Sequence, residues 1–276
     1  MLYYPEINPI ALKVGPFAVH WYGIMYLIGF FGGWGVLWLR IRRKPGWNWT
    51  PEQLSDLLFY VVLGVVLGGR VGYVLFYNFP FYITHPVQIF EMWDGGMSFH
   101  GGLLGVLLAM WLYSRQHGRR FFEVVDFIAP AVPIGLGTGR IGNFINGELW
   151  GKVANLPWTM RLPCHEPRFW RYCHGAVTGY SQPRQPSQLY EAFLEGLVMF
   201  VVLWWFSAKP RPKMAVSGLF ALLYGVFRFG VEFVRLPDPQ LGYLAFGWLT
   251  MGQVLSLPLI LGGILLLKIA YSYHQI

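Results

Sequence analysis

The sequence predicts an all-α membrane protein that crosses the bilayer seven times, and two observations support this prediction. The chain is 55% hydrophobic and 12% charged, whereas soluble domains carry about 25% charged residues. Its hydrophobic residues gather in segments of about 20 residues, the length that a helix needs to cross a hydrocarbon core about 30 Å thick. The expected spans are residues 19–39, 54–77, 97–114, 122–141, 188–207, 214–234 and 247–269.

The distribution of lysine and arginine gives the expected orientation. Basic residues concentrate in the connections after the first, third and fifth spans and at the end of the seventh: Arg40, Arg42, Arg43, Lys44, Arg115, Arg119, Arg120, Lys209, Arg211, Lys213 and Lys268. The connection 78–96 has none, the N-terminal tail has only Lys13, and the connection after the sixth span has only Arg235. Because short basic connections stay in the cytoplasm, we expect the C-terminus there and the N-terminus outside.

The segments outside the spans indicate the domain organisation. The N-terminal MLYYPEINPI lacks the basic stretch and the cleavage motif of a signal peptide, so we expect the first span to direct insertion. We expect residues 1–276 to form one membrane-embedded domain, with 143–187 as a small head outside the membrane. The head holds Cys164 and Cys173, which an oxidising compartment would allow to pair, but their spacing leaves open whether they do.

The net charge of +8 follows largely from the cytoplasmic connections and favours contact with anionic membrane lipids. The sequence has no basic stripe with interleaved aromatic residues outside the membrane, so we expect no nucleic acid partner. It also has no second histidine or cysteine at metal-ligand spacing, no nucleotide-binding loop, and neither a G-x-S-x-G nor an H-E-x-x-H motif. We therefore expect neither a metal nor another cofactor.

Three arginines interrupt or end apolar runs: Arg70, Arg140 and Arg228. A bilayer tolerates such a charge when the side chain faces a bundle interior and finds an anionic partner or a polar ligand. That partner is either a carboxylate of the protein or a phosphate. With a rise of about 1.5 Å per residue, the arginines fall near the outer boundary, level with Tyr22, Tyr26 and His100 in spans that start there.

The segment GRIGNFINGELWG, residues 139–151, follows the fourth span and combines Arg140, Asn143, Asn146 and Glu148 in a glycine-rich turn. A guanidinium suits phosphate and an asparagine amide suits hydroxyl groups, so the segment is a candidate site for a phosphorylated, hydroxylated head group. The alternative is a structural re-entrant turn whose polar side chains satisfy its own backbone.

His100 is a candidate base, because an imidazole accepts a proton from a hydroxyl or a thiol near neutral pH. Glycines on both sides of it leave space for a substrate. The alternative is a hydrogen-bonded histidine with a structural role.

The fifth and sixth expected spans, 188–207 and 214–234, contain charged residues. Glu191 and Glu195 share a helix face, and so do Arg228 and Glu232. We expect an Arg228–Glu232 ion pair, one of the two glutamates as the partner of Arg70 or Arg228, and a structural or positioning role for this set. Arg235 ends the sixth span, where it either snorkels to the surface or makes a second phosphate contact.

Glycines recur on several spans. Gly64, Gly68 and Gly72 stand at four-residue spacing, which predicts close packing of helix backbones, and the pairs 29/33 and 101/105 predict the same. The alternating glycines 135, 137 and 139 indicate either packing or the close approach of a ligand.

Together these blocks resemble the bacterial prolipoprotein diacylglyceryl transferase family. The matching blocks are HWYGIMY (20–26), GGRVGYVLFYN (68–78), WDGGMSFHGGL (93–103), GRIGNFINGELWG (139–151), PSQLYE (186–191) and FRFGVEFVRLPD (227–238). They cover nearly the whole chain in order, and seven spans with an outside N-terminus agree with the family. The family commonly has a histidine before PSQLYE, where this chain has Gln185.

The resemblance implies a monomeric transferase of the bacterial inner membrane with its active site toward the periplasm. It would move the diacylglyceryl group of phosphatidylglycerol to the lipobox cysteine of a prolipoprotein and release glycerol 1-phosphate. The implied essential residues are Tyr22, His100, Arg140, Asn143, Glu148, Gly151 and Arg235. We hypothesise that His100 is the base and that Arg140 and Arg235 bind phosphate, with Asn146, Tyr26, Arg70 and Glu232 as further substrate contacts.

Two other classes of function are compatible with buried arginines. A lipid flippase or small-anion carrier would place its binding residues near the midplane and often shows an internal repeat, and neither feature is visible in the sequence. A non-catalytic protein that binds anionic lipid would leave a lipobox peptide unmodified.

Overall fold

The structure is a computed structural model that describes residues 2–15, 17–43, 48–91, 95–237 and 242–272. In chain order its elements are β1 (Leu2–Tyr3), β2 (Ile10–Val14), β3 (Phe17–His20), α1 (Trp21–Arg43), α2 (Pro51–Phe76), α3 (Phe79–Thr84), η2 (Pro86–Phe90), α4 (Phe99–Gln116), α5 (Phe121–Ile128), α6 (Val132–Asn146), β4 (Met160–Arg161), η4 (Pro167–Tyr172), α7 (Ser187–Glu191), η5 (Ala192–Val198), α8 (Met199–Phe206), α9 (Ala215–Val231) and α10 (Met251–Ser272). The chain forms two compact units: unit 1 is Met1–Gly35 with Ile128–Ile276, and unit 2 is Val36–Phe127.

The described part of the chain contains four helices that are long and apolar enough to cross a membrane: α1, α2, the helix Ser187–Phe206 formed by α7, η5 and α8, and α10. The broken pair α5 and α6 adds a fifth if it forms one span. Pro130 and Pro133 stand at that break, where a missing N–H and the ring interrupt helical bonding. The helix α9 is apolar but has 17 residues, and α4 ends in the polar run Ser114–Gln116. The protein is thus a mostly helical, multi-pass membrane protein, and the count of seven spans stays a prediction.

In unit 2, α2 and α4 pack through their glycines, as the four-residue spacing predicts. A Cβ atom on Gly68 would lie 2.7 Å from the Gly105 Cα, and one on Gly72 would lie 2.7 Å from the Gly101 Cα. A Cβ on Gly64 would lie 2.6 Å from the Gly105 carbonyl oxygen. The two helices therefore approach closely only because these positions lack side chains.

Arg70 on α2 holds the segment that precedes α4. Its guanidinium donates to the backbone carbonyl oxygens of Gln88, Ile89, Glu91, Gly95 and Gly96, at distances between 2.6 and 3.2 Å. Only 5% of the residue is exposed. The polar ligand of this buried cation is thus backbone of its own unit, rather than Glu191 or Glu195.

In unit 1, two of the three alternating glycines of α6 serve helix packing. A Cβ on Gly29 of α1 would lie 3.0 Å from the Gly135 Cα, and one on Gly137 would lie 3.0 Å from the Gly196 Cα of η5. Gly139, just before Arg140, has nothing within 4 Å of the position of its missing side chain. Of the two interpretations, packing holds for Gly135 and Gly137, and open space for a ligand is available at Gly139.

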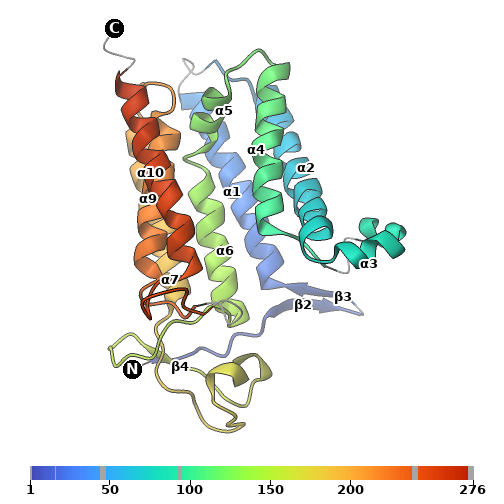
Figure 1. Ribbon diagram of the computed structural model, residues 1–276, viewed down its shortest axis with the longest axis vertical. Coiled ribbons are helices and arrows are strands. Elements are labelled where there is room, and N and C mark those ends of the chain that lie inside the picture. The colour runs from blue at the N-terminus through green and yellow to red at the C-terminus, as the bar shows by residue number, and fades with distance from the viewer. Residues whose placement is uncertain (1, 16, 44–47, 92–94, 238–241, 273–276) are drawn as a thin grey trace. The chain divides into compact units, whose positions relative to one another are not determined.

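The head of unit 1 contains β4 and η4 and lies beyond the end of the bundle where α6 ends and α7 begins, whereas the C-terminal end of α10 lies at the opposite end (Figure 1). The strands β1 and β4 pair in parallel through Leu2 and Met160, and β2 and β3 form an antiparallel hairpin. Cys164 and Cys173 form a disulfide, which answers the question that their spacing left open. Around the disulfide lies a buried cluster of Tyr4, Phe144, Trp150, Leu162, Phe169 and Tyr172.

Candidate functional site

Arg140 on α6 is paired with two carboxylates of another helical stretch, Glu191 on α7 and Glu195 on η5. Its Nε atom lies 3.2 Å from Glu191 Oε2, and its Nη2 atom lies 3.4 Å from Glu195 Oε2. Both glutamate side chains are fully buried. A buried ionised carboxylate is costly unless it is paired, so this contact accounts for two acidic residues in an apolar helix.

The local helix geometry brings the two glutamates to one guanidinium. Residues Ala192–Val198 form a π-helical segment inside the otherwise α-helical stretch from Ser187 to Phe206. Such π segments are rare and occur frequently at functional sites, because they redirect side chains that a regular helix would place elsewhere. Gly196 on this segment packs against Gly137, which brings the segment close to the backbone of α6.

Arg228 on α9 extends the pairing to a third helix. It pairs with Glu191 Oε1, and its Nη2 atom lies 2.6 Å from Glu232 Oε1. The expected Arg228–Glu232 ion pair is confirmed, and of the two candidate partners on the fifth span Glu191 is the one that Arg228 binds. Arg140 and Arg228 thus each have carboxylate partners within the protein.

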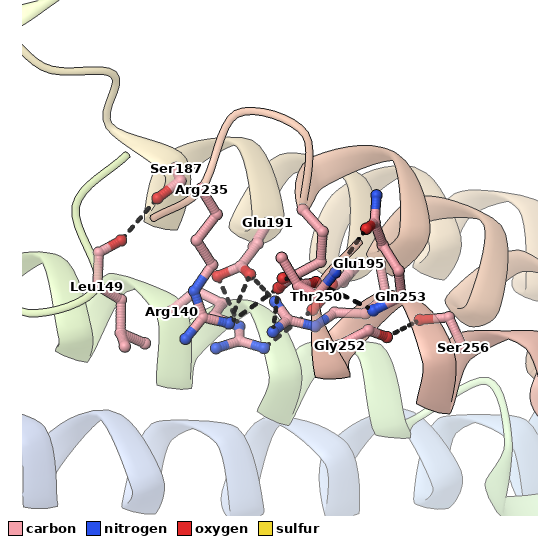
Figure 2. A network of polar contacts seen from close by, with 12 residues as sticks. Arg140, Leu149, Ser187, Glu191, Glu195, Arg235, Thr250, Gly252, Gln253 and Ser256 are labelled. Atoms are coloured by element: carbon pink, nitrogen blue, oxygen red, sulfur yellow. Dashed lines mark hydrogen bonds and ion pairs between the residues drawn. The ribbon is translucent and has the colours of Figure 1, made fainter. Parts of the chain in front are cut away.

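Arg235 completes the network on the segment that follows α9 (Figure 2). Its Nη1 atom lies 3.3 Å from Glu232 Oε1 and 3.9 Å from Glu191 Oε1. The Thr250 hydroxyl donates to Glu232 Oε2 at 2.6 Å. Only 6% of Arg235 is exposed, so the interpretation of a snorkelling arginine was wrong.

The six charged side chains form one arginine–carboxylate network: Arg140, Glu191, Glu195, Arg228, Glu232 and Arg235. Its members differ in their access to solvent. The Arg140 and Arg228 side chains are 18% and 14% exposed, whereas those of Glu191 and Glu195 are 0% exposed. Within the network, the arginine side chains therefore keep more exposed surface than Glu191 and Glu195 do.

The last turn of α6 and the two residues after it carry the predicted amides and carboxylate, one helical turn beyond Arg140. Asn143 Nδ2 donates to Glu148 Oε2 at 3.1 Å, and Asn146 Nδ2 donates to Glu148 Oε1 at 3.4 Å. Gly147 ends the helix with a φ of 76°, a left-handed conformation that favours glycine. We call residues 143–148 the polar turn. The structure thus brings three predicted site residues together.

The polar turn is also held by α7. The Ser187 hydroxyl donates to the Leu149 carbonyl oxygen at 2.6 Å, and the Gln188 amide donates to the Glu148 carbonyl oxygen. Both α7 side chains are fully buried. These bonds agree in part with the alternative interpretation of this segment as a structural turn. Its backbone carbonyl groups and its side chains have hydrogen-bond partners within the protein. Even so, the Asn146 Oδ1 and Glu195 Oε1 atoms are buried without a hydrogen-bond partner in the part of the chain that the structure describes.

Gly151 lies where three backbone segments meet. Its N–H donates to the Gln185 carbonyl oxygen at 2.8 Å, and it forms an antiparallel bridge with Arg235. A Cβ atom there would lie 2.7 Å from the Val234 carbonyl oxygen and 2.8 Å from that of Gln185. The structure therefore explains this glycine by backbone packing beside Arg235. Arg184, whose pKa is lowered by burial, donates to the Gly151 carbonyl oxygen at 3.3 Å.

Tyr22 and Tyr26 lie on α1 of the same unit. Their hydroxyl groups are 3.0 Å apart, and the Asn143 side chain is a further hydrogen-bonding neighbour of the Tyr22 hydroxyl. A Cβ on Gly142 would lie 2.9 Å from the Tyr22 ring. Tyr22 therefore belongs to the same surroundings as the polar turn.

His100 and Arg70 belong to unit 2. His100 lies in the first turn of α4, after Ser98, whose hydroxyl accepts the Gly101 N–H at 3.1 Å. It is exposed and contacts the neighbouring Phe99 ring. Of the residues named from the sequence, Lys44, residues 93–94 and residue 238 lie outside the described residues.

The sequence did not predict that Glu191 pairs with several arginines or that the Thr250 hydroxyl binds Glu232. Glu191 contacts three arginines, which helical periodicity within one span cannot reveal. Thr250 has a local signal, because its hydroxyl accepts the Gln253 N–H while the Gln253 side chain accepts the Thr250 N–H. That reciprocal pattern marks a helix N-terminus, but it does not predict the contact with Glu232.

Comparisons with known proteins found relatives that match nearly the whole chain. The family model for prolipoprotein diacylglyceryl transferase matches residues 9–269. The phosphatidylglycerol–prolipoprotein diacylglyceryl transferase of Pseudomonas paraeruginosa is 59% identical over 98% of this chain and 96% of the relative. Those of Azotobacter vinelandii and Methylococcus capsulatus are also 59% identical, over 98% and 99% of this chain and 97% and 98% of the relatives.

Proposed function

Because the chain belongs to the prolipoprotein diacylglyceryl transferase family, we propose that its arginine–carboxylate network and polar turn bind the head group of phosphatidylglycerol. The enzyme transfers the diacylglyceryl group of phosphatidylglycerol to the thiol of the lipobox cysteine of a prolipoprotein, which is the first step of lipoprotein maturation. The products are a thioether-linked lipid and glycerol 1-phosphate.

The reaction needs a thiolate and a stabilised leaving group. The thiol gives up its proton, the sulfur forms a bond to the glycerol carbon of the diacylglyceryl group, and the bond from that carbon to the phosphate oxygen breaks. The electron pair of the broken bond stays on the phosphate, whose charge therefore grows. A free cysteine has a pKa near 8.5, so a base must help to ionise it.

The observation that supports phosphate binding most strongly is the unequal exposure within the network. The Arg140 and Arg228 side chains keep some exposed surface, while those of Glu191 and Glu195 are fully buried. Fixed donors in a site of low dielectric stabilise charge that grows on a leaving group, and one such donor commonly lowers the barrier by about 3 kcal/mol. We assign phosphate binding to Arg140 and Arg228, with Arg235 as a third, less exposed donor.

The carboxylates keep these donors in place before the substrate arrives. Each buried glutamate compensates guanidinium charge, so a phosphate that enters the site would meet oriented cations rather than mobile side chains. Such preorganisation avoids the cost of rearranging charges during the reaction. Glu232 takes part in this role, because it contacts both Arg228 and Arg235.

The polar turn is suited to the hydroxyl groups of the head group. Asn143 and Asn146 both point an amide at Glu148, and the Asn146 Oδ1 atom is buried without a hydrogen-bond partner among the described residues. An unsatisfied buried acceptor is costly, and a substrate hydroxyl would remove that cost. Tyr22 and Tyr26 would add hydroxyl donors from α1.

We propose His100 as the base that takes the thiol proton. Its exposed position at the start of α4 leaves the imidazole accessible, and an imidazole is suited to proton transfer near neutral pH. Arg70, bound to five backbone carbonyl groups in the same unit, would support the segment that leads to His100 and thereby the substrate.

The protein is proposed to be a monomeric inner-membrane enzyme, one domain with seven spans, whose site faces the periplasm. The distribution of lysine and arginine supports this orientation. The head and the polar turn lie at the same end of unit 1 (Figure 1), and a disulfide in the head is consistent with an oxidising compartment.

One experiment tests this assignment. Purified enzyme in nanodiscs is given phosphatidylglycerol and a lipobox peptide, without nucleotide or metal, and the thioether-linked peptide and soluble glycerol phosphate are measured. Wild type should produce both in equal amounts, and Arg140→Ala should need far more lipid for half-maximal rate. An Arg140→Ala variant with unchanged dependence on lipid would remove Arg140 from the phosphate site.

A further inference from the structure

We propose that the disulfide-bonded loop 164–173 of the head positions the polar turn for substrate binding, with Arg168 as the positioning residue. This inference rests on the proposed function, because it concerns the same Asn143, Asn146 and Glu148 side chains. It assigns a role in the reaction to Arg168, Phe169 and the disulfide that closes their loop, none of which is part of the arginine–carboxylate network.

The first observation is that Tyr4 of the N-terminal segment and Arg168 of the head bind the last carbonyl groups of α6. The final turn of a helix leaves carbonyl groups without partners inside the helix. Here the Tyr4 hydroxyl lies 3.1 Å from the Phe144 carbonyl oxygen and 2.9 Å from that of Ile145. Arg168 Nη1 donates to the Ile145 carbonyl oxygen at 2.9 Å. These acceptors stand within the polar turn itself.

The second observation is that Arg168 is fixed from several directions. Its Nη2 atom donates to the Ile7 carbonyl oxygen at 2.9 Å and pairs with Glu166 Oε2 at 2.5 Å. The planar guanidinium thus joins the N-terminal segment, the head and the end of α6, which a single-point ammonium cannot reproduce. A cation at a helix C-terminus is also favoured by the helix dipole.

The third observation is the fit between Phe169 and Gly147. A Cβ atom on Gly147 would lie 2.5 Å from the Phe169 Cε1 atom and 2.8 Å from its Cζ atom. The ring, which is fully buried, therefore packs directly on the backbone in the middle of the polar turn. Because Phe169 belongs to η4, a shift of η4 would displace Gly147 and with it Asn146 and Glu148.

The disulfide fixes the loop that carries these contacts. Cys164 and Cys173 are nine residues apart and enclose Glu166, Arg168 and Phe169. Both cysteines are buried, at 1% and 6% exposed, in the cluster that includes Tyr4 and Phe144. Reduction would restore conformational freedom to this loop while the helices of the bundle keep their own packing.

These contacts predict a specific kinetic effect of changes in the head. If the polar turn shifts while the helices stay folded, the head group binds less well, so the KM for phosphatidylglycerol rises and the KM for the peptide does not. A loop that only stabilises the fold would instead lower the amount of active enzyme. The apparent kcat would then fall with both KM values unchanged.

The test compares Arg168→Ala with Arg171→Ala in the full-length enzyme in nanodiscs. Arg171 stands on the same η4 helix, and its guanidinium lies over the Tyr172 ring. We expect Arg168→Ala to raise the KM for phosphatidylglycerol about tenfold, since small displacements of binding groups cost this much or more. Arg171→Ala should match wild type, and Arg168→Lys should recover part of the loss because lysine still donates to one carbonyl oxygen.

The disulfide is tested by dithiothreitol on wild type and on the Cys164→Ser/Cys173→Ser double variant. Reduction should raise the KM for phosphatidylglycerol in wild type, and the double variant should have the raised KM with or without the reductant. An unchanged lipid KM after complete reduction, verified by thiol counting, would overturn the inference. So would an Arg168→Ala variant whose loss lies entirely in kcat.

An Asn143→Ala arm separates this inference from the proposed function. If Asn143→Ala itself leaves the lipid KM unchanged, the assignment of the polar turn to substrate binding fails. If Asn143→Ala raises the lipid KM and Arg168→Ala does not, the assignment stands and the positioning role of the head is overturned.

Discussion

The Arg140 Nε atom lies 3.2 Å from Glu191 Oε2, and the other oxygen of the same carboxylate pairs with Arg228. One buried carboxylate therefore orients guanidiniums from α6 and α9 at once. This relationship links three segments that are distant in the sequence, and it explains why a fully buried glutamate is retained in an apolar helix.

Replacing Glu191 by Gln should destabilise the folded protein, because it leaves guanidiniums without their counter-charge. Breaking a buried ion pair on one side commonly costs about 3–5 kcal/mol, and the retained amide volume limits any loss of packing. Thermal unfolding in detergent, followed by intrinsic fluorescence, measures the effect. Glu52→Gln on the exposed first turn of α2 is the matched control. Equal unfolding temperatures for the two variants would argue against the role of Glu191.

Replacing Arg140 by Lys should not restore activity, although it preserves the charge. Arg140 contacts Glu191 and Glu195 through different nitrogen atoms, and a lysine ammonium cannot offer that planar pair of donors. We expect a loss of about 10²–10³-fold in transfer rate, the usual effect of removing one donor to developing charge. Single-turnover transfer to a lipobox peptide measures it, and a rate within a factor of about two of wild type would contradict this assignment.

Replacing Gly151 by Ala should impair both stability and transfer. The added methyl group would lie 2.7 Å from the Val234 carbonyl oxygen, so the backbone beside Arg235 must move, at a cost of about 1–3 kcal/mol. Gly262→Ala on α10 is the control, because nothing lies within 4 Å of its Cβ position. If both alanine variants behave alike in thermal unfolding and in transfer, the backbone-packing explanation of Gly151 is wrong.

Replacing His100 by Gln should lower kcat by about 10²–10⁴-fold, the usual contribution of a general base, and leave lipid binding intact. The loss should be smaller with a peptide whose thiol is more acidic, since such a thiol needs less help to ionise. His165→Gln, on an exposed head residue, should behave as wild type. Undiminished turnover of His100→Gln would exclude His100 as the base.

Composition and apolar segments predicted the class of this protein well, because membrane helices are specified by local runs of residues. The spans 54–77 and 188–207 differ little from the helices Pro51–Phe76 and Ser187–Phe206. The span at 122–141 is divided at Ala129–Ala131, where Pro130 interrupts helical bonding, and Pro133 stands in the first turn of the next helix. Residue counts alone do not show such a break.

The sequence predicted which residues form the site better than it predicted which of them form ion pairs with each other. Arg140, Asn143 and Glu148 could be named because polar groups are expensive within apolar segments. Which carboxylate each arginine binds depends on the packing of α6, η5 and α9, and hence on the π segment Ala192–Val198, which leaves no recognisable signal in one sequence. For the same reason Arg70 could be expected to have a polar ligand, but not five carbonyl groups of its own unit.

Direct binding of glycerol 1-phosphate to the purified protein, by calorimetry, tests the central claim most directly. We expect wild type and the exposed-site control Arg42→Ala to bind it equally and to bind glycerol far more weakly. Arg140→Ala and Arg228→Ala should each weaken glycerol 1-phosphate binding about tenfold or more, the value of a charge-assisted hydrogen bond. Equal affinity in all four proteins, with all of them folded, would show that these guanidiniums do not hold the phosphate.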